Sequence, residues 1–342
     1  MASRAGIGLD IGTTAVRVVQ VAERRGRLRV TRMGEVALPP GAVREGEVVD
    51  SAAVAAAIRQ LWAEVRPSSK RVGLGLASRR VVVRQVDLPS MPVDELRASL
   101  PFAVGDLIPM PTDAAMLDFW PVEERDAGGG SVVRGLLVAA AKQAVDDAVG
   151  AVQAAGLTPV SIDILPFALL RALHSGAPQD APPAVEALVD IGADVTSMVV
   201  HSAGRPLFVR SLLRGGAAAT EAIATRLAVD FATAEALKRG DLAPPDVETG
   251  EAVRALLDES AAEVALEIRN SLGYYAATAG GSSPVERVVL SGGGALLSGL
   301  LPRLVLDGMP VEVASPTHAL PGDDSVPSFA TAIPVGLALG CI

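Results

Sequence analysis

The stretch GLDIGTTAVR, residues 8–17, places an acidic residue, a glycine and two hydroxyls between two apolar runs. The second run, residues 16–21, alternates in the way that a strand does. A turn of this composition offers backbone N–H groups and hydroxyls to phosphate oxygens, and a carboxylate at the end of a strand can hold a hydrated Mg²⁺. Taken alone the pattern is not specific, because Asp-x-Gly turns are also common in hairpins.

Length and composition set the limits for the rest of the chain. Its 342 residues suffice for two domains. No uninterrupted apolar run reaches about 18 residues, so we expect no transmembrane helix. The first five residues lack the apolar core of a signal peptide. The net charge of −9 argues against binding to nucleic acid or to anionic lipid through surface charge.

Cysteine and histidine are rare. The single cysteine, Cys341, excludes an intrachain disulfide and fits a reducing cytoplasm. The three histidines, His174, His201 and His318, are scattered along the sequence. With one cysteine and three scattered histidines, a structural zinc site is not expected.

The motif of the first turn recurs far along the chain, in LVDIGADVT at residues 188–196. Asp190 and Gly192 again follow an apolar run and again precede a predicted hairpin. Two equivalent strand–turn–strand units, each opening a domain, indicate a duplicated fold. We expect the two turns to face each other across a cleft, where their N–H groups meet a polyphosphate and Asp10 and Asp190 share a Mg²⁺.

Residues 87–158 differ in character from the segments on either side. We expect a helix at 94–108, bent or shortened by Pro101, and a strand pair joined by the glycines at 128–130. A further helix is expected at 142–155. Such an inserted unit is either an ordinary structural layer or a partner-binding module. The segment 175–183, SGAPQDAPP, has the composition of a linker.

Three further features of the second half concern a ligand. Gly215 and Gly216 precede a predicted helix, and such glycines either allow close approach of a ligand or simply make the turn. Glu235 and Lys238 share one face of a helix that ends at Gly240, as a surface ion pair or as ligand contacts. The glycines at 292–294 lie between a strand and a helix expected at 296–304, and they make room for a flat base or sugar.

Taken in order, these features resemble the actin-like ATPase superfamily, which includes sugar kinases and heat-shock 70 chaperones. The superfamily's two phosphate loops match residues 10–17 and 190–196, and its adenosine motif matches residues 291–297. Its two connecting helices match residues 163–172 and 330–339. Glu235 and Lys238 match its Ala-Glu-x-x-Lys helix. The resemblance implies an α/β, actin-like fold of two domains, each ribonuclease H-like, with an inserted α/β subdomain.

The implied domains follow the superfamily's layout. The first actin-like domain takes residues 1–86 and is completed by 159–178 and 319–342. The inserted, partner-binding subdomain takes 87–158, and the second actin-like domain takes 184–318.

Within the superfamily the chain resembles the PilM family of type IV pilus assembly. The resemblance is carried by LPPGA at 38–42, DLIPMP at 106–111 followed by LDF at 117–119, AGL at 155–157 leading to VSID at 160–163, and EALKRG at 235–240. The FtsA family shares the inserted subdomain but typically ends in an amphipathic membrane-targeting helix, which this sequence lacks.

The resemblance implies ATP with Mg²⁺ between the two domains. The residues that it assigns to the cofactor are Asp10, Gly12, Thr13, Thr14, Arg17, Asp190, Gly192, Thr196, Gly215, Gly216, Glu235, Lys238, Gly292, Gly293 and Gly294. Asp10 and Asp190 would hold the Mg²⁺ through water, and Asp163 would position the attacking water as the catalytic candidate.

Three departures from the superfamily point to slow or absent hydrolysis. Arg17 replaces a lysine that relatives often have. Asp194 would repel a γ-phosphate if it pointed inward, and Pro334 is expected to interrupt the final helix.

The family's partner is the cytoplasmic N-terminal peptide of PilN, a bitopic inner-membrane protein. We therefore expect a PilN-like peptide near the inserted subdomain, and pilus assembly ATPases and further copies of the chain as other possible partners. The expected location is cytoplasmic, peripheral at the inner face of the membrane through the partner. Two alternatives stay open, namely an FtsA-like cell-division scaffold and a small-molecule kinase of the same superfamily.

Overall fold

Two five-stranded sheets with the same topology form the frame of the molecule. The computed structural model describes residues 5–24, 26–126, 131–174, 184–278, 284–304, 308–314 and 331–342. The predicted linker at 175–183, the glycines at 128–130, His318 and Ala330 lie outside these residues. The first sheet has the strand order β10-β6-β1-β2-β3 and the second has the order β13-β12-β11-β14-β15.

The two sheets also agree in strand direction. In the first, β2 lies antiparallel between β1 and β3, whereas β6 lies parallel between β1 and β10. In the second, β12 is antiparallel to β11 and β13, and β14 is parallel to β11 and β15. This strand-by-strand match confirms the predicted duplication. The strands are β1 (Ala5–Ile11), β2 (Ala15–Arg24), β3 (Arg27–Ala37), β6 (Arg71–Leu76), β10 (Thr158–Ile164), β11 (Val185–Ile191), β12 (Thr196–Ser202), β13 (Arg205–Leu212), β14 (Arg287–Ser291) and β15 (Val311–Val313).

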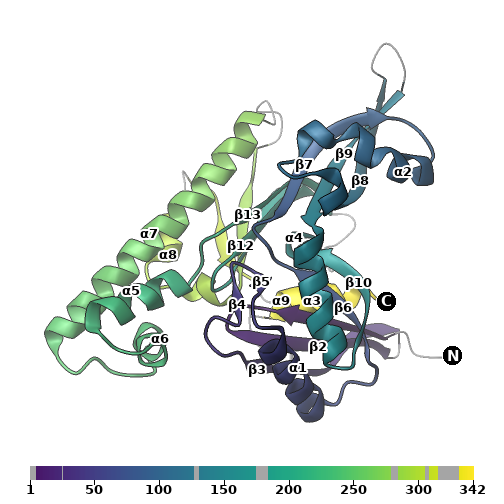
Figure 1. The fold of residues 1–342 in the computed structure, drawn as a ribbon. Coiled ribbons are helices and arrows are strands. Elements are labelled where there is room, and N and C mark those ends of the chain that lie inside the picture. The colour runs from purple at the N-terminus through teal and green to yellow at the C-terminus, as the bar shows by residue number, and fades with distance from the viewer. Residues whose placement is uncertain are drawn as a thin grey trace.

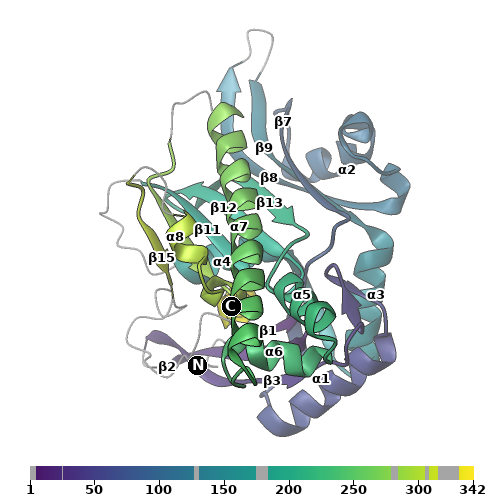
Figure 2. The same ribbon diagram turned by 90° about the vertical axis from the view of Figure 1, so that its left-hand side faces the viewer.

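Helices cover the outer face of each sheet (Figure 1). On the first sheet these are α1 (Ser51–Val65) and α3 (Lys142–Ala154), which share its core. Figure 2 shows the long α7 in front of the second sheet, with α5 and α6 near one end. The helices of this domain are α5 (Ala217–Leu227), α6 (Phe231–Arg239), α7 (Val247–Thr278) and α8 (Leu300–Leu304). The helix expected at 296–304 is instead two elements, the 3₁₀ turn η3 (Gly293–Leu296) and α8.

Two further helices, α4 (Leu165–His174) and α9 (Ala332–Leu339), lie between the sheets and share one core with both of them. The helix α9 approaches β1 so closely that a Cβ at Gly8 would collide with the carbonyl oxygen of Pro334. A Cβ at Gly336 would likewise collide with the carbonyl oxygen of Ala168 in α4. Glycines are therefore what let α4 and α9 pack against each other and against the first sheet.

Pro334 lies in the first turn of α9, where its missing N–H costs no helical hydrogen bond. The expectation that Pro334 interrupts the final helix is therefore wrong for residues 331–342.

The alternation of β1 sets the direction of the predicted site. Ile7 and Leu9 pack in the core with α1, whereas Gly6 and Gly8 face α9. Successive strand residues point to opposite faces, so Asp10 lies on the α9 side, between the sheets. In β11, by the same alternation, Glu186 and Asp190 share a face with Leu188, which packs in the core around α4 and α9.

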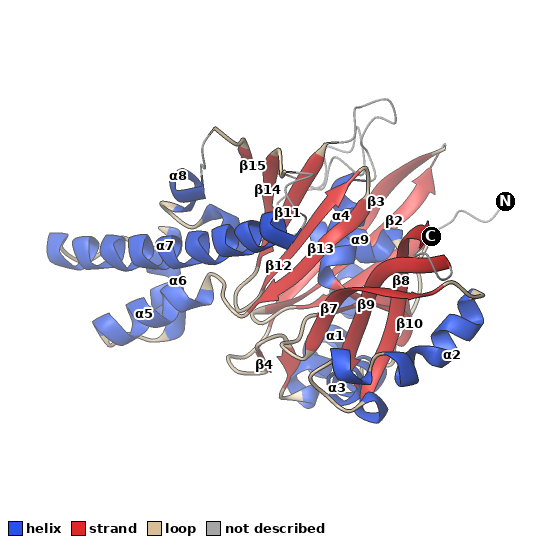
Figure 3. Ribbon diagram, turned by 90° about the horizontal axis from the view of Figure 1, so that it is seen from above, coloured by secondary structure: helices blue, strands red, loops and turns tan. Residues whose placement is uncertain are grey.

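A third sheet, of order β7-β9-β8, is formed by β7 (Val81–Pro89), β8 (Ala115–Asp126) and β9 (Ser131–Ala141). The helix α2 (Val93–Ala103) covers it and ends before the 3₁₀ turns η1 (Gly105–Leu107) and η2 (Thr112–Ala114). Figure 3 shows this unit from above, on the far side of the molecule from α5–α7. The helix α3, which we included in the predicted insertion, packs against α1 in the first core.

A short hairpin, β4 (Val43–Arg44) with β5 (Glu47–Val48), precedes α1. Among the described residues, no helix combines the length and the apolar character needed to cross a membrane.

Candidate functional site

The two predicted phosphate turns have the same backbone geometry. The N–H of Gly12 donates to the carbonyl oxygen of Ala15, and the N–H of Gly192 donates to that of Val195, each over 3.0 Å. In both cases the turn joins the two antiparallel strands that open a sheet. The second motif therefore repeats the first in three dimensions as well as in sequence.

Asp10 and Asp190 end the first strand of each sheet, and each is 8% exposed. Burial raises the pKa of Asp10, an effect that the nearby Arg17 opposes. Burial, followed by the negative charge of Asp10, raises the pKa of Asp190 to about 7, against the effects of Ser291 and Arg17. The charge of Asp10 thus reaches Asp190 of the other domain, so the two strand ends lie near each other.

Arg17 pairs with carboxylates within its own domain. Its Nη1 lies 3.8 Å from Oδ2 of Asp10, and its Nε donates to Oε2 of Glu35 over 2.9 Å. Of the two hydroxyl residues in the turn, Thr13 is half-buried and Thr14 is exposed. The turn therefore presents hydroxyls and a guanidinium beside a buried carboxyl group.

The turn at Gly215 and Gly216 is tied to the second phosphate turn. The N–H of Gly216 donates to the carbonyl oxygen of Gly192, and that of Ala217 to the carbonyl oxygen of Ala193, each over 2.9 Å. A Cβ at Gly215 would collide with both of these carbonyl oxygens. Gly215 is therefore required by the approach of the two backbone segments.

Lys238 and Glu235 lie at the same place, on α6. The Nζ of Lys238 donates to the carbonyl oxygen of Gly216 over 3.1 Å and pairs with Oε2 of Glu235 at 2.6 Å. The hydroxyl of Thr220 donates to the same carboxylate. The pair is thus anchored to the glycine turn and is not a free surface ion pair.

The glycines at 292–294 run along the end of β11. Gly292 has a φ of 82°, and Cβ atoms at Gly292 or Gly294 would collide with Ile191. A Cβ at Gly293 would meet nothing within 4 Å. A Cβ at Gly216 would lie 3.7 Å from both the Cα of Gly294 and the Nζ of Lys238. Gly216, Gly294 and Lys238 therefore lie close together, and Gly293 is exposed beside them.

Two predicted residues of the second phosphate turn are engaged in hydrogen bonds to other segments. Thr196 is buried, and its hydroxyl donates to the carbonyl oxygen of Arg214 over 2.6 Å. The Oδ2 of Asp194 accepts a 3.1 Å hydrogen bond from the N–H of Glu45, in the β4–β5 hairpin of the first domain. Asp194 thus holds a contact between the domains.

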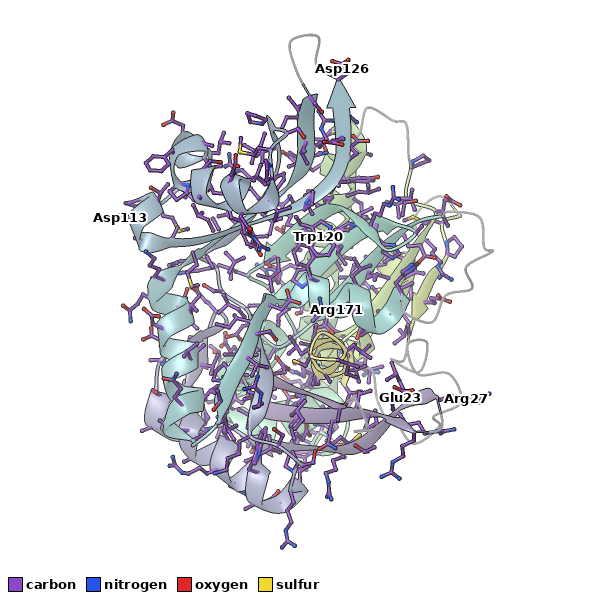
Figure 4. The ribbon with its side chains drawn as sticks, turned by 90° about the vertical axis from the view of Figure 1, so that its right-hand side faces the viewer. Glu23, Arg27, Asp113, Trp120, Asp126 and Arg171 are labelled. Atoms are coloured by element: carbon purple, nitrogen blue, oxygen red, sulfur yellow. The ribbon has the colours of Figure 1, made fainter. Side chains whose placement is uncertain are left out.

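Asp163 is engaged in the packing of the connecting helices. Its Oδ2 pairs with Nη2 of Arg171, whose Nε donates to the carbonyl oxygen of Gly336 over 3.0 Å. Figure 4 shows Arg171 beside α9, which is seen end-on. Asp163 and Asp10 lie two strands apart with β6 between them, which corresponds to about 10 Å. This ion pair ties β10 to α4 and α9.

Sequence reasoning missed three residues of this region: Glu35, Glu45 and Ser291. Ser291 was only the edge of the adenosine motif, yet its hydroxyl is hydrogen-bonded to Asp190. The sequence around Glu35 and Glu45 does not mark them as site residues, because strand pairing brings Glu35 to the site and a contact between the domains brings Glu45 there. Their partners, Arg17 and Asp194, were the only sequence clues.

Two sheets of one topology, each opened by the same turn, with two helices packed between them, define an actin-like α/β protein. The family model described as Type IV pilus assembly protein PilM matches residues 8–329. The chain therefore belongs to the PilM family of type IV pilus assembly proteins, as its sequence resemblance predicted.

Solved structures agree with this assignment. The chain is similar to the "PilM-PilN type IV pilus biogenesis complex", with 30% identity, 98% of each chain covered and a TM-score of 0.82. The fold is also that of the ethanolamine utilization protein EutJ from Carboxydothermus hydrogenoformans, at 17% identity over 99% of this chain and 90% of that one, with a TM-score of 0.58. MreB5 of Spiroplasma citri bound to ADP gives 14% identity, coverages of 97% and 94%, and a TM-score of 0.51.

Proposed function

We propose that this chain is an actin-like scaffold of type IV pilus assembly that binds Mg-ATP between its two domains, with slow or no hydrolysis. It also holds the cytoplasmic N-terminal peptide of a PilN-like membrane protein. The main support for the nucleotide site is the pair of buried carboxyl groups, Asp10 and Asp190, at the ends of equivalent strands.

The residues present fit a magnesium nucleotide. Two carboxylates that face each other in a poorly hydrated site repel, and a divalent cation between them removes that repulsion. Mg²⁺ keeps several of its waters, so Asp10 and Asp190 would hold it through water. When bound, the ion neutralises phosphate charge between the two turns.

The glycine cluster fits the nucleoside end. Gly293 presents an exposed backbone without a side chain, Gly294 packs directly on Ile191, and Lys238 and Glu235 lie beside Gly216. MreB5, which shares the fold, is a structure with bound ADP. The Gly12 and Gly192 turns would then take the phosphates from the two domains at once, and nucleotide binding would bias the angle between the domains.

Slow hydrolysis is supported by the position of Asp163. A general base must be able to accept a proton from the attacking water. The carboxylate of Asp163 instead pairs with Arg171, which is itself bound to the backbone of α9. The ion pair with Arg171 therefore occupies a carboxylate oxygen that a water-activating base would need to have free.

A groove between the first domain and the insertion fits the peptide. It measures about 470 Å³ and is lined by Arg79 and Arg80, by Pro109 and Met110 of the family motif, and by Lys142, among others. The apolar side chains suit a short peptide with apolar anchors. Arg79 and Arg80 already pair with Glu45 and Glu47, and Asp146 also lines the groove, so the polar rim is mixed in charge. A partner with a membrane span would hold the chain at the inner face of the cytoplasmic membrane, within reach of the pilus assembly ATPases.

Hydrogen exchange of the full chain tests both halves of the proposal. Mg-ATP should protect the amides of the turns at 10–17 and 190–196, and the N-terminal peptide of a PilN-like protein should protect the groove around Met110. Met110→Glu should abolish the second effect only, and Val247→Ala, at an exposed position of α7, should change neither. Absence of protection at both turns would overturn the nucleotide site, and absence at the groove would overturn the peptide site.

A further inference from the structure

Two of the three histidines, scattered in sequence, meet at one end of the second sheet, where β11 begins and β12 ends. His201 lies on β12, and His174 is the last residue of α4. Their ring centroids are 5.0 Å apart, and the rings are nearly edge to face. Glu186, on β11, is the direct cross-strand partner of His201. The fold thus brings together two imidazoles and a carboxylate whose proximity the local sequence does not predict.

His201 is unusual because one of its nitrogens is buried without a hydrogen bond. The residue is 0% exposed, and Nε2 makes no hydrogen bond to the described residues. Oε2 of Glu186 lies 3.4 Å from that nitrogen. The other nitrogen, Nδ1, accepts a long bond of 3.4 Å from the N–H of Gly204. A buried polar atom without a partner calls for an explanation.

We propose that His174, Glu186 and His201 bind a divalent transition-metal ion, for which zinc is the best match. Their ligand atoms all lie within 4.8 Å of one another. Ligands around a tetrahedral zinc ion are about 3.3 Å apart, given bonds of about 2.0–2.1 Å. The 3.4 Å separation of His201 Nε2 and Glu186 Oε2 already matches that spacing. Two imidazoles and one carboxylate are a known zinc ligand set, with a fourth position for water.

The surroundings of the cluster suit a metal ion. Nη2 of Arg287 donates to Oε1 of Glu186 at 2.6 Å, which fixes the carboxylate and leaves Oε2 directed at His201. The positive charge of Arg287 is shared with Glu312, 3.3 Å from its other terminal nitrogen.

Metal binding at Nε2 requires one proton shift. The neutral ring carries its proton on Nε2 while Nδ1 accepts from Gly204, and the ion would move that proton to Nδ1. The Nδ1–H would then face the N–H of Gly204, so that amide would lose its acceptor and turn aside, a cost that the new bond from nitrogen to metal would offset. Imidazole ligands favour zinc over Mg²⁺ and Ca²⁺, which prefer oxygen.

The proposed metal is separate from the nucleotide site. Glu186 precedes Asp190 by four residues along β11, which corresponds to about 13 Å. The ion would fasten the end of α4 to β11 and β12, and so hold the first connecting helix on the second domain. This inference does not depend on nucleotide binding.

Zinc titration of the full chain, with any purification tag removed and after chelator treatment, tests the proposal. Competition with a chromophoric chelator should show one equivalent of tightly bound zinc. His174→Gln and Glu186→Gln should each weaken binding at least tenfold, because each removes one of three ligands. His318→Gln and Cys341→Ser, which change the remaining histidine and the single thiol, should leave binding unchanged.

Two readouts separate loss of the site from loss of the fold. Zinc should raise the thermal unfolding midpoint of the wild-type chain but not that of His174→Gln, whose side chain is only half-buried. Cobalt should give visible absorption without a thiolate charge-transfer band. No stoichiometric zinc uptake, or equal uptake by His174→Gln, Glu186→Gln and wild type, would overturn the proposal. Loss of binding in His318→Gln or Cys341→Ser alone would also overturn it.

Discussion

The backbone N–H of Glu45 donates to Oδ2 of Asp194 over 3.1 Å, and this bond links the first domain to the second phosphate turn. Glu45 has a left-handed φ of 50° in the β4–β5 hairpin, a conformation that is costly for a residue with a side chain. The bond therefore joins a strained hairpin to the turn that we assign to phosphate.

Asp194→Ala removes this bond and should release the hairpin. We expect faster hydrogen exchange of the Glu45 amide and a loss of about 1 kcal/mol or less in unfolding free energy, because the contact is exposed. Asp194→Asn keeps an acceptor oxygen and serves as the control that retains protection. Unchanged exchange at Glu45 in Asp194→Ala would show that the domains do not use this contact in solution.

Asp190 should make stability depend on pH. Its folded pKa, about 7, lies above the unfolded value of 3.8, so ionisation in the fold is penalised. The penalty is absent below about pH 4, grows between pH 4 and 7 and is complete above that. Asp190→Asn should therefore raise the free energy of unfolding at pH 8 by up to about 4 kcal/mol and change it little at pH 4. Urea denaturation with EDTA present measures both values, and an equal change at the two pH values would contradict this origin.

Substitution by alanine should affect ligand binding at Gly293 and stability at Gly215. A Cβ at Gly293 meets nothing within 4 Å, whereas one at Gly215 collides with the carbonyl oxygens of Gly192 and Ala193. Gly293→Ala should keep the thermal midpoint and weaken ATP binding roughly tenfold or more, by about 1.4 kcal/mol. Gly215→Ala should lower the midpoint of the chain without ligand. If Gly293→Ala binds ATP as the wild type does, the base or sugar does not lie against this loop.

Asp163 should behave as a structural residue. Asp163→Asn breaks the pair with Arg171 that ties β10 to α4 and α9, so we expect a loss of roughly 1–3 kcal/mol in unfolding free energy. ATP affinity, measured by calorimetry, should stay within about twofold. An unchanged stability together with a lost slow ATPase activity would instead assign Asp163 to catalysis.

The local sequence pattern was enough to predict the two turns and the duplicated sheets. Asp10, Gly12, Asp190 and Gly192 form the predicted turns because an apolar run ending in Asp-x-Gly sets both strand and turn within a few residues. The matching strand order of the two sheets then followed from the repeat. These features depend on neighbours in sequence, which a single sequence displays.

Other features depend on contacts between distant segments, and the sequence did not reveal them. Thr196 turns its hydroxyl to the backbone of Arg214, and Asp194 bonds to Glu45, because β12 and the β4–β5 hairpin happen to lie there. His174 and His201 meet only because α4 packs on β12. Pro334 was misjudged because the start of α9, which decides whether a proline interrupts a helix, carried no clear cap signal.

In the proposed site, Asp10 and Asp190 hold a magnesium nucleotide between the domains. Calorimetric titration of ATP, with and without Mg²⁺, tests it in the wild type, in Asp10→Ala and in Asp190→Ala. We predict Mg²⁺-dependent binding of one ATP by the wild type, and a loss of at least tenfold in affinity in each variant. Asp194→Asn, in the same turn, should bind as the wild type does. Unchanged Mg-ATP affinity in both aspartate variants would contradict the account.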